Sequence, residues 1–306
     1  MEGFFVVASC NGLICIGWPF SSRTVCNPCT GIYKEIYNFA VPGCLTNYGS
    51  GYDDVNDDYK VVRLTDQTFH NGSRYMVRRM AEVYSLKLDC WSMVEVGSCR
   101  GESQHLGSAA LIESHLLHWR YCHIGYGTYQ ISCFDLRNNR WGNDVPLPDF
   151  SVEIDTSKRT YLVNFGVLDG CLCLMTSNYQ SIEDDLWVMK NYGVKDSWVK
   201  LASISYMNLS PPSKISPVAC AKGSQSEILM IRKDSPSKLF WYNIGDKTLR
   251  WPELHDVPAY YEACISKGSI VSIPGGVSFK LEHQGVTDSW IQNDGVGTEM
   301  QLLLRM

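Results

Sequence analysis

Long apolar runs, a basic excess and blocks of one charge sign are absent from this sequence, and each absence excludes a class of protein. No apolar run of about 18 residues occurs, so we expect no transmembrane helix. The formal net charge is −5, whereas a general nucleic-acid binder normally carries a basic excess. We therefore expect a protein that binds neither nucleic acid nor membrane.

The N-terminus lacks the basic start and the long apolar stretch of a secretory signal, because Glu2 is acidic and the apolar segment after it is short. We interpret this segment as a strand and expect an intracellular protein, cytoplasmic and/or nuclear. The 13 cysteines are odd in number and scattered. In a reducing compartment, this predicts free thiols, most of them buried as small apolar side chains.

Catalytic motifs are also absent: the sequence has no G-x-S-x-G nucleophile elbow, no P-loop and no G-x-G-x-x-G after a strand. We therefore predict a protein that is not an enzyme and has no catalytic, cofactor-binding or metal-binding residues and no cofactor. Because a fold does not decide function, a β-propeller enzyme with an active site in its channel is the alternative.

A short repeated unit is the main signal that the sequence does contain. In each copy an apolar strand is followed by a turn of Asp, Asn, Gly or Lys, and an aromatic residue then opens a second strand. The copies are Arg23–Tyr33, Glu82–Trp91, Ser132–Trp141, Asp185–Trp198 and Leu239–Trp251.

The spacing of the closing aromatic residues predicts the fold. Successive spacings are 58, 50, 57 and 53 residues, near the period of about 50 residues of kelch-type propeller blades. We predict an all-β, kelch-like β-propeller of about five to six four-stranded blades, because a single blade cannot bury both of its faces. The closing aromatics would pack between blades; they are Tyr33, Trp91, Trp141, Trp198 and Trp251.

A second hairpin precedes each of these units, as in Val6–Ile16, Ala109–Trp119 and Val163–Leu174, where a polar or Gly-containing turn separates two apolar runs. Each blade would then have an inner and an outer hairpin. We expect the propeller domain to cover residues 1–273, with a last strand near Tyr260–Ile273 that completes the first blade. Residues 274–306 lack the repeat, so we expect an irregular C-terminal tail there.

Clusters of possible metal ligands have simpler explanations. His115 and His118 would point to opposite faces of one strand, and a single C-x-x-C at Cys26 and Cys29 lacks a second ligand pair. Cys171 and Cys173 are interpreted as buried thiols. The acidic segment from Asp53 to Asp58 fails the EF-hand pattern and is interpreted as a turn that bonds its own backbone.

Three arginines form the strongest local charge feature: Arg74, Arg78 and Arg79. They would lie in a loop or outer strand of the second blade. One interpretation is a solvated strand edge, where charge discourages edge-to-edge pairing. The other is a contact for an acidic partner.

Several ordered motifs resemble one family. Ser9–Cys15, Asn27–Gly31 and Gly51–Arg63 resemble the opening segments of the plant F-box-associated interaction domain, and Glu82–Trp91 and Asp185–Trp187 match it further on. The resemblance covers roughly residues 4–273. The family includes S-locus F-box proteins and F-box/kelch-like substrate receptors.

The resemblance implies a role as the substrate-recognition part of an SCF (Skp1–cullin–F-box) E3 ubiquitin ligase, which binds target proteins for ubiquitylation. In that family an F-box precedes the domain and binds Skp1, whereas only a few residues precede Cys10 here. We therefore do not expect this chain by itself to bind a Skp1-type adaptor. A truncated or decoy binding protein without a ligase role is the alternative.

Overall fold

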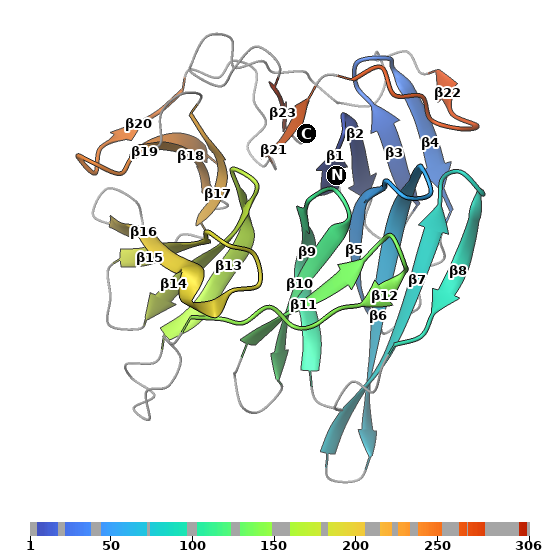
Figure 1. The fold of residues 1–306 in the computed structure, drawn as a ribbon, viewed down its shortest axis with the longest axis horizontal. Coiled ribbons are helices and arrows are strands. Elements are labelled where there is room, and N and C mark those ends of the chain that lie inside the picture. The colour runs from blue at the N-terminus through green and yellow to red at the C-terminus, as the bar shows by residue number, and fades with distance from the viewer. Residues whose placement is uncertain are drawn as a thin grey trace. The chain divides into compact units, whose positions relative to one another are not determined.

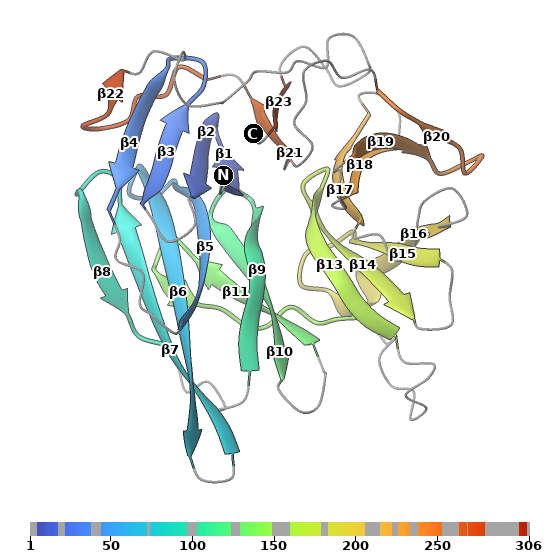
Figure 2. The ribbon, with the colours of Figure 1, turned by 180° about the vertical axis from the view of Figure 1, so that it is seen from behind.

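The computed structural model describes the parts of the chain that form strands and the turns between them (Figures 1 and 2). The described residues are 5–17, 22–37, 44–71, 74–96, 103–123, 129–148, 160–178, 183–205, 215–221, 226–232, 238–252, 263–267, 269–278 and 300–304.

Tight turns with left-handed residues close the repeated hairpins. Asp57, Asp89 and Asn139 have φ of 52°, 56° and 53° just before an outer or middle strand. Asp and Asn tolerate this region better than other side chains, since they bond locally to the backbone. The inner turn at Asn11 and Gly12, with φ of 49° and 84°, has the two positive values of a type I′ hairpin. The Asp, Asn and Gly residues of these turns therefore serve to adopt the left-handed backbone conformation that the hairpins require.

The strands form antiparallel four-stranded sheets in chain order. The first three are β1 (Phe5–Cys10), β2 (Leu13–Gly17), β3 (Arg23–Asn27), β4 (Ile32–Ile36); β5 (Cys44–Asp53), β6 (Asp58–Asn71), β7 (Arg74–Ser85), β8 (Cys90–Val94); and β9 (Ser103–Ile112), β10 (Leu116–His123), β11 (Tyr129–Asp135), β12 (Arg140–Trp141). The next two are β13 (Thr160–Leu168), β14 (Cys171–Asn178), β15 (Glu183–Met189), β16 (Trp198–Ser205); and β17 (Ile215–Cys220), β18 (Glu227–Arg232), β19 (Lys238–Asn243), β20 (Leu249–Arg250). We call these sheets blades 1 to 5, and the predicted all-β propeller of four-stranded blades is confirmed, with five blades in the described chain.

The blades belong to two units. Unit 1 comprises residues 1–145 and 269–280 and holds blades 1 to 3, and unit 2 comprises residues 146–268 and 281–306 and holds blades 4 and 5. A short 3₁₀ helix, Lys195–Ser197, precedes β16 in unit 2. The described part of the chain contains no helix that is long and apolar enough to cross a membrane.

Alternate residues of the middle strands of blade 2 pack against different neighbours. Val61 and Tyr84 join a buried cluster with Leu13, Cys15 and other residues of blade 1. The residues next to them, Val62 and Val83, join a cluster with blade 3 that includes Trp119 and Phe134. Because side chains alternate between the faces of a strand, both faces of blade 2 are buried and its strands can be apolar at successive positions.

Blades 4 and 5 of unit 2 share one core. Cys173, Met175 and Leu186 of blade 4 pack with Met230 and Phe240 of blade 5, and all five side chains are almost fully buried. Removing one such side chain from water contributes about 1.5–3 kcal/mol, so this cluster is the main stabilising contact between the two blades.

Two short strands lie within residues 274–306, for which the sequence predicts an irregular tail. A short strand, β22 (Val277–Ser278), pairs with β4 at Tyr33 and Ile32 and becomes a fifth strand on the outside of blade 1. A further strand, β23 (Met300–Leu304), pairs with β21 (Ala263–Lys267). The expected strand near Tyr260–Ile273 is thus β21, and all four original strands of blade 1 come from the N-terminal residues 5–36.

Side-chain hydrogen bonds explain why an unpatterned segment joins blade 1. The Nδ2 atom of Asn27 donates to the backbone oxygens of Ser269 and Val271, at 3.1 and 2.7 Å. Lys34 Nζ donates to the carbonyl oxygen of Pro274 at 3.1 Å. These bonds fix the backbone of the segment without a repeat motif, so strand periodicity could not reveal them.

Candidate interaction surface

Buried charge holds together the turn between β5 and β6. Asp53 is fully buried, and its Oδ1 accepts the backbone N–H groups of Val55 and Asn56 at 3.0 Å each. Its Oδ2 accepts Lys60 Nζ at 2.7 Å. Burial acts to raise the pKa of Asp53, but the hydrogen bonds from Lys60 and Asn56 outweigh it and hold the pKa below its usual value. The acidic segment is therefore a self-bonded turn with an internal counter-charge.

The same lysine ties blade 2 to blade 3. Lys60 Nζ also donates to the carbonyl oxygen of Leu136 at 2.7 Å and to Asn139 Oδ1 at 3.0 Å. On the surface above, Arg137 donates to both carboxylate oxygens of Asp54, at 2.5 and 2.7 Å. The hydrogen bond from Arg137 is the main cause of the lowered pKa of Asp54. The turns at this end of blades 2 and 3 are thus bonded to one another.

Two apolar side chains on these hydrogen-bonded turns are exposed to solvent. Lys87 bonds to the neighbouring turn at two points. Its backbone N–H donates to Asp58 Oδ1, and its Nζ donates to the carbonyl oxygen of Asn56. Val55 and Leu88, on the two turns so joined, are 70% and 72% exposed. This end of blade 2, the turn face, presents apolar groups on a backbone that is already ordered.

At the opposite end of blade 2 the strands β6 and β7 run past their neighbours (Figures 1 and 2). Backbone pairing between them continues to Asn71 and Arg74, whereas β5 accompanies β6 only to Gln67 and β8 pairs with β7 only from Ala81 onward. We call the part beyond these neighbours, residues 68–71 and 74–80, the ribbon.

Two ion pairs across β6 and β7 hold the base of the ribbon. Asp66 and Arg79 are directly opposite, and the guanidinium donates to both carboxylate oxygens at 2.7 and 3.0 Å. Three residues farther into the blade, Arg63 is opposite Glu82, and its guanidinium donates through Nε and Nη2 to the one oxygen Oε2 of that carboxylate. The register is therefore fixed by charge as well as by the turn.

These pairs could have been found from the sequence. A hairpin whose turn lies between Asn71 and Arg74 brings Asp66 opposite Arg79 and Arg63 opposite Glu82, so opposite charges coincide twice in one register. Gly-Ser at positions 72 and 73, the two residues between Asn71 and Arg74, is one of the two-residue hairpin signals.

The structure separates the three arginines that the sequence singles out. The side chain of Arg79 is almost fully buried against Asp66, so its charge is already balanced. Arg78 is exposed, and Arg74 opens β7 opposite Asn71. A role in partner contact for these residues stays a prediction, and Arg79 is better described as part of the base of the ribbon.

The closing aromatics occupy several environments. Trp91 packs on the cluster between blades 1 and 2, and Trp141 packs on the cluster between blades 2 and 3. Trp198 is buried, with its indole N–H bonded to the carbonyl oxygen of Pro146 at 2.8 Å. Trp251 is 46% exposed and contacts Phe240 at the outer edge of blade 5. Tyr33 lies in β4 opposite Cys26 and Val277.

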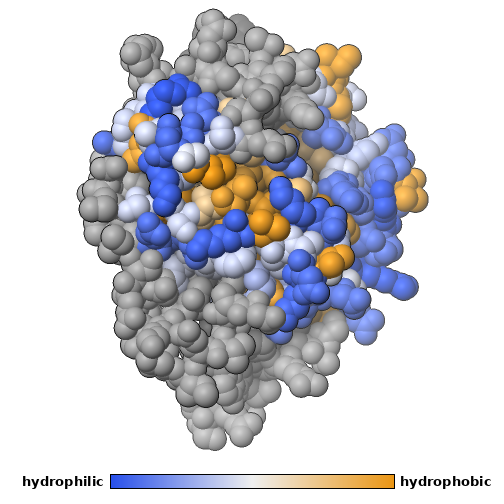
Figure 3. Space-filling view, turned by 60° about the vertical axis from the view of Figure 1, so that its left-hand side comes forward, coloured by the Kyte–Doolittle hydropathy of each residue, from blue (hydrophilic) through white to orange (hydrophobic). Residues whose placement is uncertain are grey.

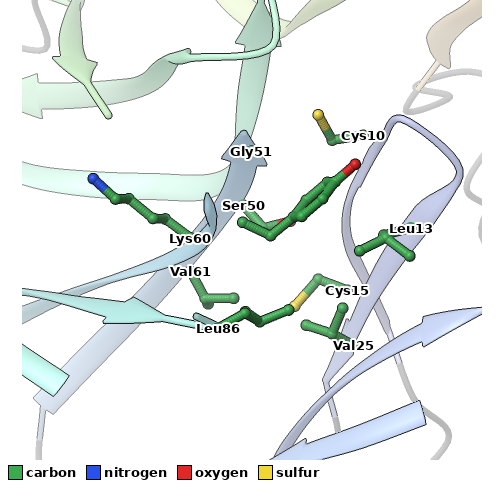
Figure 4. Close-up of a pocket in the computed structure, with 10 residues that line it drawn as sticks. Cys10, Leu13, Cys15, Val25, Ser50, Gly51, Lys60, Val61 and Leu86 are labelled. Atoms are coloured by element: carbon green, nitrogen blue, oxygen red, sulfur yellow. The ribbon is translucent and has the colours of Figure 1, made fainter. Parts of the chain in front are cut away.

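A small cavity lies between blades 1 and 2 (Figure 4). Cys10, Leu13 and Cys15 line it from the first hairpin, and Ser50 and Lys60 line it from β5 and β6. Its volume is about 10 Å³, about enough for a single water molecule and far below the size of a substrate pocket.

His115 and His118 of blade 3 are core residues. His118 is fully buried and its Nδ1 lies 3.3 Å from the carbonyl oxygen of Ala110, while His115 Nδ1 contacts the carbonyl oxygen of Glu113. Burial lowers the pKa of His118 to about 4, so the ring is neutral at physiological pH. Within the described residues, no group of three or more His, Cys, Asp or Glu side chains could hold a metal ion.

Unit 2 also exposes apolar side chains. Val194 and Val199, on either side of the short 3₁₀ helix, are about half exposed. The face drawn in Figure 3 shows an apolar patch bordered by hydrophilic residues.

Comparison with known families gives a match over residues 3–268, to the model described as the F-box associated beta propeller domain. The matched region takes in all five blades, so it covers the fold as a whole.

Curated relatives from Arabidopsis thaliana share this region. The F-box protein CPR1 is 28% identical, with 87% of this chain and 67% of that protein covered. The F-box protein At4g22390 is 29% identical over 66% of this chain and 51% of its own length. The F-box/kelch-repeat protein At3g23880 is 24% identical over 87% of this chain and 68% of its own length. The chain thus spans about two thirds of the length of two of these relatives and about half of the third.

Proposed function

Since the chain belongs to the F-box associated beta propeller domain family, we propose that it binds a target protein as the substrate-recognition part of an SCF E3 ubiquitin ligase. The observation that carries this proposal is the family match across all five blades, together with relatives that are F-box proteins. The target would be ubiquitylated once it is held near the rest of the ligase.

The structure supports binding through pre-ordered surfaces. The turns of blades 2 and 3 are joined by Lys60 and by the pair of Asp54 and Arg137, so a partner need not order them on binding. Recognition residues are commonly carried by loops on such a scaffold. We propose a non-enzymatic role, without cofactor, and a cytoplasmic or nuclear location, because 13 cysteines suit a reducing compartment.

A fusion experiment tests the proposal. The chain is joined behind an F-box segment that binds a Skp1-type adaptor and is expressed in plant cells, with the F-box segment alone as the control. We expect a small set of proteins to fall in abundance only with the fusion and to recover when the proteasome is inhibited. If the two samples have the same protein abundances, the proposed function is wrong.

The adaptor is tested separately with the chain alone. We propose that the chain does not bind a Skp1-type adaptor tightly by itself, because the resemblance assigns that contact to an F-box. Calorimetric titration of the purified chain with the adaptor measures this directly. A sub-micromolar dissociation constant would show that the blades themselves contact the adaptor.

A further inference from the structure

Among the described strands, none pairs with the outer edge of β7 along the ribbon. Over Arg74–Met80 the strand pairs with β6 on one side, and no other described strand pairs with it on the other side. An open strand edge presents alternating backbone N–H and C=O groups, which another extended chain can pair with. Seven residues, at about 3.3 Å each, give an edge of about 23 Å, enough for a short peptide strand.

The edge is held in place before any partner arrives. The bidentate pair of Asp66 and Arg79 and the pair of Arg63 and Glu82 lie at the root of the ribbon and fix the register of its two strands. A partner strand would therefore add to an existing ladder, which lowers the entropy lost on binding.

Charge indicates what kind of peptide fits. Between Gln67 and Ala81 the sequence contains Arg74, Arg78 and Arg79 but no Asp or Glu, although the chain as a whole has a net charge of −5. Asp66 balances Arg79, and the side chain of Arg78 is exposed. Positions 74 and 78 fall on the same face of β7, because residues four apart on a strand share a face.

We propose that the Arg74–Met80 edge of β7 receives an extended, acidic segment of the target protein as an added strand. This inference rests on the proposed function, since it names the part of the chain that holds the target. Acidic residues four positions apart in the added strand would match the spacing of Arg74 and Arg78. The exposed charge of Arg78 would thus select a partner as well as discourage self-pairing.

A peptide fits this edge better than a nucleic acid does. A protein that binds DNA through its phosphates makes about 6–10 such contacts, whereas the ribbon has two arginines beyond the pair with Asp66. The alternating backbone donors and acceptors of the edge match another peptide backbone and have no such match in a phosphate chain.

The test uses the full chain and a defined probe, a fluorescent eight-residue peptide of alternating Glu and Val, with a Lys-Val peptide of the same length as the control. Fluorescence anisotropy measures binding. We expect the acidic peptide to bind and the basic peptide to show no saturable binding. Equal binding of the two peptides would overturn the proposal, and so would competition by inorganic polyphosphate with no protection of β7 amides.

Charge-reversal variants locate the contact. We expect Arg78→Glu and Arg74→Glu each to weaken acidic-peptide binding about fivefold, since an exposed charge pair contributes up to about 1 kcal/mol. Arg140→Glu makes the same charge change on an exposed residue of β12, next to the turns of blade 3, and should change binding less than twofold. A larger effect of Arg140→Glu than of Arg78→Glu would contradict the assignment.

Hydrogen exchange separates strand addition from simple charge attraction. Bound acidic peptide should slow the exchange of alternate backbone amides between Tyr75 and Met80. Binding without this protection would show that the peptide does not pair with the edge.

The fusion experiment distinguishes this inference from the proposed function. If the fusion with Arg78→Glu still depletes the same proteins as the unaltered fusion, the ribbon is not the target site, and the proposed function stands. If the unaltered fusion depletes nothing while the acidic peptide still binds the ribbon, the proposed function fails, and the peptide site itself stands.

Discussion

The ammonium group of Lys60 lies 2.7 Å from the carboxylate of Asp53, and both side chains are buried. The same ammonium group bonds to blade 3 at Leu136, so one ion pair orders a turn and joins two blades. Its energetic role follows from the cost of leaving either charge alone in the interior.

We expect Lys60→Met to lower the free energy of unfolding by about 3 kcal/mol, because it leaves the carboxylate of Asp53 buried without its counter-charge. Urea unfolding of the variant at neutral pH measures this. Adding Asp53→Asn to Lys60→Met should recover part of the loss, and a double variant less stable than Lys60→Met would contradict the explanation.

The same pair predicts a pH dependence. The folded-state pKa of Asp53 is lowered, so its stabilisation is present above the unfolded-state value of about 3.9 and is lost as the pH falls through the folded-state value. We expect the unaltered chain to lose this contribution only below about pH 4. In Lys60→Met the carboxyl group of Asp53 should take up its proton at a higher pH than in the unaltered chain. The free energy of unfolding in urea, measured across a pH series, shows this.

Gly51 predicts a site where a single methyl group is not tolerated. A Cβ atom there would lie 2.5 Å from the backbone oxygen of Ser114 and 2.7 Å from Leu136 Cδ1. We expect Gly51→Ala to destabilise unit 1 by about 1–3 kcal/mol, since backbone must move to relieve the overlap. Gly142→Ala is the matched control, because its nearest neighbour would be 3.7 Å away. Equal melting temperatures for the two variants would contradict this reading.

The closing tryptophans should differ in their contribution to stability. Trp141 packs against Trp119 and Phe134, with ring centroids 6.1 and 5.2 Å away, whereas Trp251 is 46% exposed. We expect Trp141→Ala to cost about 3 kcal/mol and Trp251→Ala about 1 kcal/mol in urea unfolding. A larger loss for Trp251→Ala would mean that blade 5 depends on this residue in a way its exposure does not indicate.

Thiol reactivity should follow burial. Burial raises the pKa of Cys15 and of Cys173 to about 12, so at mildly alkaline pH almost none of either is thiolate. Cys29 and Cys90 are exposed. We expect a maleimide reagent to modify Cys29 and Cys90 before Cys15 and Cys173, as read by peptide mass spectrometry. Early modification of Cys173 in the folded chain would show that blades 4 and 5 open more readily than their packing indicates.

How much the sequence could predict depends on the range of the interaction. The hairpin turns rely on local residues such as Asp57 and Asn139, whose φ values are positive, so strands and turns could be read from the repeat. The packing of the partly buried Trp141 beside Trp119 and Phe134 is consistent with the same period. The exposure of Trp251 does not follow from the period, because it depends on what lies beside β20.

The ribbon shows the same limit for the candidate site. The three arginines were visible in the sequence, and the coincidence of opposite charges at Asp66 with Arg79 and at Arg63 with Glu82 indicates the register of the hairpin. Whether the outer edge of β7 has a partner depends on where β8 stops, and no local residue pattern predicts this. Likewise, Ser269 and Val271 are bound by Asn27 across more than 240 positions, beyond the range of any periodicity.

The hydrogen bonds of Asn27 to Ser269 and Val271 have a consequence for synthesis of the chain on the ribosome. Blade 1 is translated before blades 2 to 5, but its fifth strand and the partners of Asn27 are translated after all five blades. N-terminal segments begin to fold while the rest of the chain is being made. The side-chain amide of Asn27 therefore lacks its two carbonyl acceptors in blade 1 until residues 269–278 have been translated. A chaperone that shields exposed strand edges would therefore stay bound longest at blade 1, whose β4 lacks its partner β22 until that segment is translated.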